Sequence, residues 1–574
     1  MMNQLPPSMH RQPWGRISIL FVVVFLVCGY TSVHFLWPKD SWGAFSRHVE
    51  LITEGVWYLI SHSTSIKLVN YINTLKEYEI FDGMVFAICM SVLGSMLVST
   101  IFVFWFIWVP GGVCRLLKID GPNLYEGRAL NKALASHSRK IIEASQINVH
   151  PRLTLSEKEL EGNIFAFGQQ GSGKSVVIKQ LLKSIVGSGE QVVIYDEKRE
   201  YTEILYDPED TILIAPWDKR SAYWDISKDL TVFEDFELLA SRLISGKASD
   251  PMWSNGARSI FSGMLAFCRA QNAHCWGWED ISNALATDDF VLRELLEKHY
   301  PAATRFVEPT SKTTHGFMST LLADTSWISS IGKNWVKTKE NTFSIKQWLN
   351  GEYPNIKKLI IQSHPQFKHV GSPLCNSLLG FLTSSMLSQP DGNAPKTWLI
   401  LDELGNLSRN DSFKEWLSLG RSKGCRCVAG TQSVSQLRDI YGDDSTETIL
   451  NLFSTIISLR CGAPSDAAEY AAKCFGEGVF ERPSMSSEHS KNVINWQKEV
   501  NNLVTADHLK HIPEANDGVL GYITSSGWNS VFKLKWPYPN MAKISEGHIP
   551  ANWMEERDHK RTRKRNGRLR YRPC

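Results

Sequence analysis

The chain has 574 residues, of which 43% are hydrophobic, and its formal net charge is +3 at pH 7. This length accommodates roughly three or four domains. The 11 cysteines include no C-x-x-C pair and no Cys/His quartet with zinc spacing, which argues against a structural metal and indicates reduced thiols in a cytosolic body.

Two apolar runs near the N-terminus are long enough to cross a membrane. Residues 17–37 form a run of 21 residues and residues 84–109 a run of 26, both without Asp, Glu, Lys or Arg. A helix of about 20 apolar residues spans the hydrocarbon core. A cleaved signal peptide is the alternative for the first run, but a second run follows and no convincing cleavage site separates them. The sequence therefore predicts a transmembrane hairpin.

The flanking charges predict the orientation of this hairpin. Residues 1–16 contain Arg11 and Arg16, whereas residues 38–83 contain four basic and six acidic residues. By the positive-inside rule both ends of the hairpin are cytoplasmic, and residues 38–83 lie in the periplasm if the cell is Gram-negative. This aromatic-rich segment is either a small helical cap or partner-binding surface, or a simple spacer. The basic residues that follow the second run are Arg115, Lys118, Arg128, Lys132, Arg139 and Lys140.

A phosphate-binding loop is the firmest signal in the sequence. An apolar stretch, residues 164–167, runs into G-x-x-x-x-G-K-S, and the helix-like VVIKQLL follows. In this motif backbone N–H groups surround the phosphates, Lys174 reaches the β and γ oxygens, and the Ser175 hydroxyl ligates Mg²⁺. The predicted nucleotide-binding residues are Gly168, Gln169, Gln170, Gly171, Ser172, Gly173, Lys174 and Ser175.

Short apolar runs alternate with helical stretches after residue 161, which indicates a mostly parallel sheet covered on both faces. The predicted nucleotide-binding domain comprises residues 110–228 and 341–550. Residues 229–340 have helical periodicity and little strand signal, so we expect an inserted all-α domain there. The predicted strands are QVVIYD, TILIAP, KKLIIQS, TWLILDE, CVAGTQS and TIISLR.

The run TWLILDE has the pattern of a Walker B strand. Asp402 at the end of this strand is placed to hold Mg²⁺, and Glu403 to polarise the attacking water. Arg421 and Gln432 follow, and ring ATPases use such residues to contact or sense the γ-phosphate. From the sequence alone Arg421 is equally well a solvated surface charge.

The C-terminal segment, residues 551–574, is strongly basic. It carries nine Lys or Arg against three acids, so the rest of the chain sums to about −3. Such a segment attracts nucleic-acid phosphates. A solubilising end or a contact with anionic lipid is the alternative.

The chain resembles the TraD/TrwB-type coupling proteins of bacterial conjugation and type IV secretion. The resemblance covers nearly the whole chain and includes several family-specific stretches. These are the two-span hairpin, GQQGSGKS, VVIYDEKREYTEILYDP, DPMWSNGARSIF, ILDELGNL, GRSKG, AGTQSVSQLRDIYG and LRCGAPSDAAEYAA.

The resemblance implies a multi-pass protein of the bacterial inner membrane with a RecA-like P-loop ATPase domain in the cytoplasm. It implies a homo-hexamer that uses ATP and Mg²⁺ to drive single-stranded or plasmid DNA toward components of the type IV secretion channel, after recruiting the relaxase and relaxosome accessory proteins. It further implies that Arg421 is the arginine finger, with Arg460 as the alternative, and that Gln432 is the strand-end glutamine. The acidic, Gln-rich C-terminal extension of the longest TraD proteins has no counterpart in this sequence, so docking through such a tail is not implied.

Two alternative functions fit parts of the sequence. A chromosome translocase of the FtsK/HerA kind shares the core, but the sequence has two spans and no long Pro/Gln linker. A membrane receptor that only binds nucleotide, and so gates the docking of secreted protein substrates, does not require Glu403. ATP hydrolysis with and without single-stranded DNA distinguishes a motor from such a receptor.

Overall fold

The chain folds into two compact units in the computed structural model. One unit comprises residues 1–120 and 479–500, and the other residues 121–478 and 501–574. The structure describes residues 14–36, 49–50, 53, 57, 66–106, 117–140, 144–244, 251–273, 275–338, 340–392, 395–462, 466–488 and 491–555.

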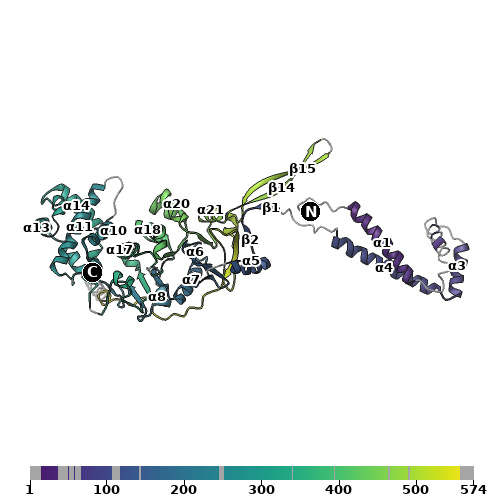
Figure 1. Cartoon of the computed structure of the whole chain (residues 1–574), viewed down its shortest axis with the longest axis horizontal. Helices are drawn as coiled ribbons and strands as arrows, with labels where there is room; N and C mark the ends of the chain where they lie inside the picture. Colours follow the sequence, from purple (N-terminus) through teal and green to yellow (C-terminus); the bar gives the residue numbers. More distant parts are fainter. Residues whose placement is uncertain are drawn as a thin grey trace, which may run out of the picture. The chain divides into compact units, whose positions relative to one another are not determined.

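The first unit contains the two apolar helices, α1 (Trp14–Leu36) and α4 (Phe81–Phe106), which pack against each other (Figure 1). Their stretches Ser18–Leu36 and Phe81–Trp105 are long and apolar enough to cross a membrane. Residues 107–109 of the predicted second span lie outside the described residues.

Small side chains form the middle of the buried stripe of α4, between Met84 and Val103. Ala87, Ser91, Ser95 and Ser99 repeat every fourth residue and are all buried. A Cβ atom on Gly29 of α1 would lie 3.5 Å from Ser95 Oγ, so the two backbones approach closely at this point. Close packing over small residues is a usual way for helices to associate within lipid.

The first unit also contains a short helix, within the segment where a small helical cap is one of the expected alternatives, and a sheet that the sequence analysis does not predict. The helix α3 precedes α4, and the sheet has the order β1-β14-β15, with β1 antiparallel to β14. These elements are α3 (Ile66–Glu77), β1 (Leu117–Asp120), β14 (Glu477–Glu488) and β15 (Lys491–Asn502).

A ten-stranded sheet forms the centre of the second unit. The apolar runs of the sequence become its central strands, and these are buried because helices cover both faces. All neighbouring pairs from β13 to β7 are parallel, whereas β16 is antiparallel to both of its neighbours. In spatial order the strands are β2 (Asn123–Tyr125), β17 (Ser530–Trp536), β16 (Val519–Ser525), β13 (Thr455–Ser458), β5 (Ile164–Phe167), β12 (Cys425–Thr431), β11 (Thr397–Leu401), β6 (Gln191–Asp196), β10 (Lys358–Gln362) and β7 (Thr211–Ile214).

The helices of this unit connect the strands, and a short antiparallel pair, β3 (Ala144–His150) and β4 (Leu153–Ser156), precedes β5. The capping box of α6, in which Ser156 and Glu159 satisfy each other's backbone N–H groups, fixes the turn that leads into β5. The helices are α5 (Gly127–Lys140), α6 (Glu157–Leu160), α7 (Lys174–Ser188), α8 (Glu200–Leu205), α9 (Ile226–Asp229), α16 (Ile345–Leu349), η4 (Pro365–Phe367), α17 (Lys368–Leu387), η5 (Leu404–Asn406), α18 (Asp411–Leu419), η6 (Arg421–Lys423), α19 (Val434–Tyr441), α20 (Asp443–Asn451), α21 (Asp466–Cys474) and α22 (Ala506–Lys510).

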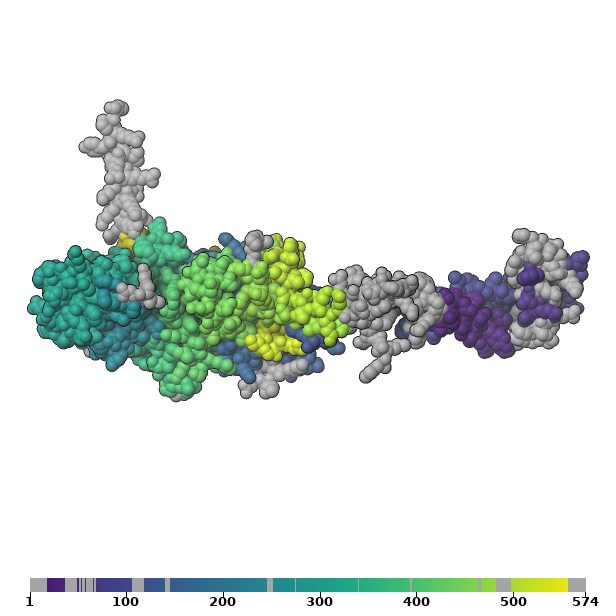
Figure 2. Space-filling view, turned by 90° about the horizontal axis from the view of Figure 1, so that it is seen from above, coloured from purple at the N-terminus to yellow at the C-terminus, as the bar shows by residue number. Residues whose placement is uncertain are grey.

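A helical lobe lies between β7 and β10 in the chain, and in the space-filling view it forms one end of this unit (Figure 2). Its two ends meet, because β8 (Tyr223–Trp224) and β9 (Thr342–Phe343) pair with each other. Its described helices are α10 (Phe233–Leu243), α11 (Pro251–Gln271), α12 (Trp278–Leu285), α13 (Asp289–His299), η3 (Pro301–Phe306), α14 (Lys312–Thr325) and α15 (Ile328–Gly332).

The last described residues run beside the segment that follows β7, the edge strand of the sheet. Lys219 N–H donates to the carbonyl oxygen of Ile549 at 2.9 Å, Ala551 N–H donates to that of Trp217 at 2.9 Å, and Trp553 Nε1–H donates to that of Pro216 at 3.0 Å. The chain enters this unit at β2, on the opposite edge of the sheet. The rest of the predicted basic tail, residues 556–574, lies outside the described residues.

Candidate nucleotide site

The phosphate-binding loop lies between β5 and α7, where the sequence predicts it. Its backbone is held by Gly168 N–H, which donates to Thr431 O at 3.2 Å, and by Gln169 N–H, which donates to Arg460 O at 2.9 Å. Gly173 has φ +91°, and a Cβ atom there would meet Val519 at 2.3 Å. Only glycine fits this position. It leads directly into α7, whose N-terminal N–H groups are of the kind that bind phosphate.

The two acidic residues after β11 contact the two polar residues at the start of α7. Lys174 Nζ lies 2.6 Å from Glu403 Oε2, and both side chains are 8% exposed. Ser175 Oγ donates to Asp402 Oδ2 at 3.0 Å. The other oxygen of Glu403 accepts the Gln432 backbone N–H at 3.2 Å. The structure therefore brings Lys174, Ser175, Asp402, Glu403 and Gln432 together in one site.

The pair of Ser175 and Asp402 fits a bound Mg²⁺. Burial raises the pKa of the Asp402 carboxyl, and the nearby Lys174 ammonium opposes this shift. Asp402 Oδ1 is buried and has no hydrogen-bond partner among the described residues. A hydroxyl and a carboxylate with an unused oxygen are the ligands that Mg²⁺ takes beside a phosphate.

Sequence reasoning misses several residues of this site. A Cβ atom at position 430 would lie 2.8 Å from Lys174 Cδ, so Gly430 leaves room for the lysine stem. The loop opens into a cavity of about 550 Å³ whose far wall comes from a distant part of the chain. The stretch AGTQ is the only sequence signal for Gly430, and the distant wall has none. The residues of that wall are Ile512, Pro513, Glu514, Ala515, Gly518, Val519, Leu520 and Tyr538.

Arg421 lies away from the nucleotide site of its own chain. It precedes β12, whereas the phosphate loop adjoins the other end of that strand, where Thr431 pairs with Phe167. The seven residues of β12 separate the two ends by about 20 Å. Arg421 is 58% exposed and forms an ion pair with Glu161 at 2.8 Å.

Arg460, the alternative arginine, lies inside the cavity of its own chain. It follows β13, the neighbour of β5, and its Nη2 lies 2.8 Å from Glu514 Oε1. Glu514 is 82% exposed, and Arg460 Nε is buried without a hydrogen-bond partner among the described residues. This geometry suits a contact to nucleotide bound in the same chain.

The strand order β13-β5-β12-β11-β6, with the phosphate loop after β5 and the acidic pair after β11, defines a RecA-like P-loop protein. Within that class, the chain belongs to the type IV secretion-system coupling proteins, because residues 148–527 match the family model described as the type IV secretion-system coupling protein DNA-binding domain.

Individual relatives agree with this assignment. The coupling protein TraD of Escherichia coli (strain K12) is 25% identical over 571 residues, which cover 94% of this chain and 77% of TraD. The unbound structure of the conjugative coupling protein TrwB superimposes with a TM-score of 0.65 at 20% identity and covers 77% of this chain and 98% of that one. TrwB in complex with ADP and Mg²⁺ gives a TM-score of 0.62 at 19% identity, with 77% and 99% covered. The structural matches confirm the predicted RecA-like fold.

Proposed function

We propose that this chain is an inner-membrane ATPase that drives single-stranded DNA toward a type IV secretion channel. The observation that carries the proposal is the contact of Lys174 and Ser175 with Glu403 and Asp402. Two further facts support it. The chain belongs to the coupling-protein family, and TrwB has been solved with ADP and Mg²⁺ and with the ATP analogue ADPNP.

The ion pair of Lys174 and Glu403 sets the order of events when ATP binds. An arriving γ-phosphate competes for the Lys174 ammonium and draws it away from Glu403. Glu403 then accepts a hydrogen bond from the attacking water, while Gln432 N–H holds the other carboxylate oxygen. Ser175 and Asp402 would hold Mg²⁺, which neutralises charge on the β and γ phosphates.

Arg421 completes the site of a neighbouring subunit in this proposal. Its position at the opposite end of β12 supports a role in trans, as a head-to-tail ring requires. We assign it as the arginine finger of a homo-hexamer, and Gln432 as the residue that senses the γ-phosphate within each chain.

The remaining parts of the chain serve location and recruitment. The two apolar helices anchor the protein in the bacterial inner membrane, with the nucleotide unit in the cytoplasm. The helical lobe between β8 and β9 contacts the relaxase, the relaxosome accessory proteins or their DNA.

Two variants test the hydrolysis step. Lys174→Ala abolishes turnover, because the phosphates lose their main cation. Glu403→Gln retains bound ATP and lowers turnover by about 10²–10⁴-fold, the usual contribution of a positioned base. ATPase rates and nucleotide binding are measured on the detergent-solubilised full chain, with Glu447→Gln, an exposed carboxylate on α20, as the control. An unchanged ATPase rate in either variant contradicts the assignment. If the unmodified chain binds ATP but does not hydrolyse it, the protein is a nucleotide-gated receptor and not a motor.

A further inference from the structure

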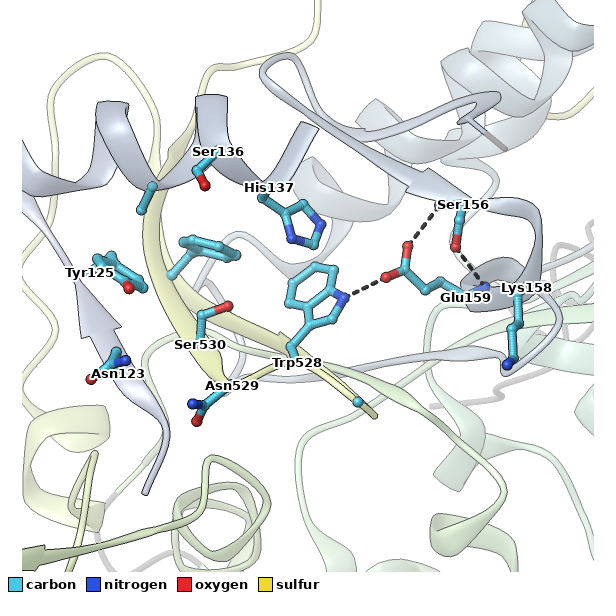
Figure 3. A pocket seen from close by; sticks show the side chains of 13 residues that line it. Asn123, Tyr125, Ser136, His137, Ser156, Lys158, Glu159, Trp528, Asn529 and Ser530 are labelled. Atoms are coloured by element: carbon cyan, nitrogen blue, oxygen red, sulfur yellow. Dashed lines mark hydrogen bonds between the residues drawn. The ribbon is translucent and has the colours of Figure 1, made fainter. Parts of the chain in front are cut away.

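A second cavity, of about 740 Å³, opens at the edge of the sheet formed by β2 and β17 (Figure 3). It is distinct from the nucleotide site. Ser530, at the start of β17, pairs with Asn123. The turn before it follows Ser525, which pairs with Thr455, and Thr455 in turn pairs with Ile164 at the start of β5. The phosphate loop follows the end of β5, so the cavity lies at the opposite end of the strands.

Aromatic rings form one wall of this cavity. The ring of His137 packs edge-on against Trp528 with centroids 4.5 Å apart, and Trp528 packs against Phe532 at 5.6 Å. Tyr125 stacks on Phe532 at 5.8 Å. In Figure 3 the side chains of His137 and Trp528 point toward each other, and Tyr125 lies farther along the same wall.

The indole of Trp528 is held in a fixed orientation. Its Nε1–H donates to Glu159 Oε1, and the other oxygen of Glu159 accepts the Ser156 backbone N–H at 2.7 Å. Glu159 therefore belongs to the capping box of α6 and cannot move freely. A ring fixed in this way presents a stacking surface that loses little conformational entropy when a planar ligand binds.

The rim of the cavity carries groups that hydrogen-bond to polar edges. Asn529, Ser530 and Ser136 line it together with Asn123. Amides and hydroxyls both donate and accept, so they match the mixed donor and acceptor edges of heterocyclic bases.

A row of cations runs beside the rim. The helix α5 contains four basic residues and no acidic residue. Arg128, Lys132 and the cavity residue Ser136 are spaced by four residues, and Arg139 follows by three, so these side chains share one helix face. Arg128, Lys132 and Arg139 are exposed and form no ion pair with another described residue. Lys158 adds a further exposed cation at the rim.

We infer that this cavity binds an unpaired base of a single-stranded nucleic acid whose phosphates lie along α5. A stacking surface and an adjacent cation row are the two components of single-strand binding. The polar rim adds groups that can hydrogen-bond to the edges of an unpaired base. A lipid headgroup accounts for the cations but leaves the aromatic wall and the polar rim without a role. The inference rests on the proposed function in one respect, that DNA is the substrate of the motor. It adds a binding site outside the ATPase centre.

The first test separates contacts with the base from contacts with the phosphate. Fluorescence anisotropy is measured on the solubilised full chain with a labelled 12-residue dT oligonucleotide and with an abasic oligonucleotide of equal length and charge. Trp528→Ala lowers the affinity for dT about tenfold, within the range for loss of one stacked base, and leaves abasic binding unchanged. Trp528→Phe, which retains an aromatic face, keeps most of the affinity.

The cation row is tested with the same two oligonucleotides. Arg128→Gln and Lys132→Gln together weaken both complexes and reduce the slope of log K against log salt by about 0.7 for each lost phosphate contact. The control is Lys473→Gln, because Lys473 is exposed on α21 and does not line the cavity. Retained ATP hydrolysis in each variant shows that it is folded.

A second measurement locates the bound base directly. An oligonucleotide carrying 5-iodouracil is crosslinked to the wild-type chain by light and mapped by mass spectrometry, with crosslinks expected at Trp528, His137 or Tyr125. Equal affinity of the wild-type chain for the dT and abasic oligonucleotides, or crosslinks confined to other segments, overturns the site. Loss of binding to phosphatidylglycerol vesicles in the α5 variant, with oligonucleotide binding unchanged, assigns the surface to lipid and also overturns it. Each of these outcomes leaves the ATPase proposal intact, whereas a wild-type chain without turnover contradicts only that proposal.

Discussion

At the scale of single residues, Arg460 provides a test of whether this arginine contacts nucleotide bound to its own chain or to a neighbouring subunit. Its backbone carbonyl oxygen accepts the Gln169 N–H at 2.9 Å, and its side chain lines the cavity next to the phosphate loop of its own chain. Arg460→Ala should weaken ATP binding about tenfold, the size of a lost hydrogen bond to a charged group. Glu514→Gln should tighten it, because the carboxylate competes with the phosphate for the guanidinium.

Both effects are measured by equilibrium binding of a fluorescent ATP derivative to solubilised protein. The exposed Glu447→Gln again serves as the control for loss of a carboxylate. If Arg460→Ala binds ATP normally and lowers turnover only in mixed assemblies, the arginine acts on a neighbouring subunit.

Asp196, at the end of β6, makes stability depend on pH. Burial raises the pKa of its carboxyl to about 6, and hydrogen bonds from Thr202 oppose the shift. The pKa of this carboxyl in the folded state exceeds its unfolded value of about 3.9. Its contribution to the free energy of unfolding is therefore present in full below about pH 3.9 and is lost as the pH rises through 6. Asp196→Asn keeps an oxygen that can accept from Thr202 and removes the charge. The variant should therefore lack the pH-dependent change in the free energy of unfolding, which is about 3 kcal/mol for this carboxyl.

The measurement is the melting temperature of the wild-type and Asp196→Asn chains at pH 4.5 and pH 7.5. Stability of the variant relative to the wild type should rise with pH, and a constant difference between the two chains contradicts the assignment.

Motif spacing predicts which residues meet at the phosphate loop, because each motif follows a strand and the strands of a parallel sheet end at the same edge, even where another strand lies between them. Lys174 and Glu403 are an example. Val519 and Tyr538 were beyond such reasoning. They reach the cavity from segments more than 300 residues away in the chain, and single apolar residues carry no local signal of a distant partner.

At the scale of elements, the central strands could be predicted because strands buried on both faces read as unbroken apolar runs. The edge strand β7 is among the predicted strands, whereas β17 near the other edge is not. β17 has the sequence SVFKLKW, in which buried and partly exposed residues alternate near the edge of the sheet, and the insertion of charges hides the strand. The hairpin of β14 and β15 is rich in polar residues and was also missed.

The position of η6 at the start of β12 leads to a complementation test. Arg421→Ala and Lys174→Ala chains are each inactive alone in the proposed ring. Mixing them should restore part of the ATPase rate, because some interfaces then combine an intact loop with an intact arginine. The rate is followed over a series of mixing ratios of solubilised protein, with Arg409→Ala, an exposed arginine paired to Asp411, as the control. Absence of recovery at every ratio indicates a role in cis, or a motor that tolerates no inactive subunit.

At the scale of the whole molecule, truncation tests the role of the basic tail. Among the described residues, Ala551 and Trp553 hold this end of the chain to the segment after β7, so a chain that ends at Met554 retains these contacts. Truncation there should weaken DNA binding and flatten its salt dependence, because up to nine cations are lost, while basal ATP hydrolysis stays unchanged.

Anisotropy titrations at several salt concentrations check this expectation. Unchanged affinity at low salt excludes the DNA role of the tail, and reduced binding to anionic vesicles in that case assigns it to lipid.

The junction of β8 and β9 bears on how such proteins diversify. Because the helical lobe leaves and re-enters at two paired segments, Tyr223–Trp224 and Thr342–Phe343, its replacement leaves the register of the ten-stranded sheet untouched. An exchange of the lobe at this junction would have to preserve the ion pair of Arg242 with Glu415 at 2.7 Å, which links α10 to α18. Under the proposed recruitment role of the lobe, preference for a relaxase or its DNA would change with the lobe while the residues of the nucleotide site stay the same.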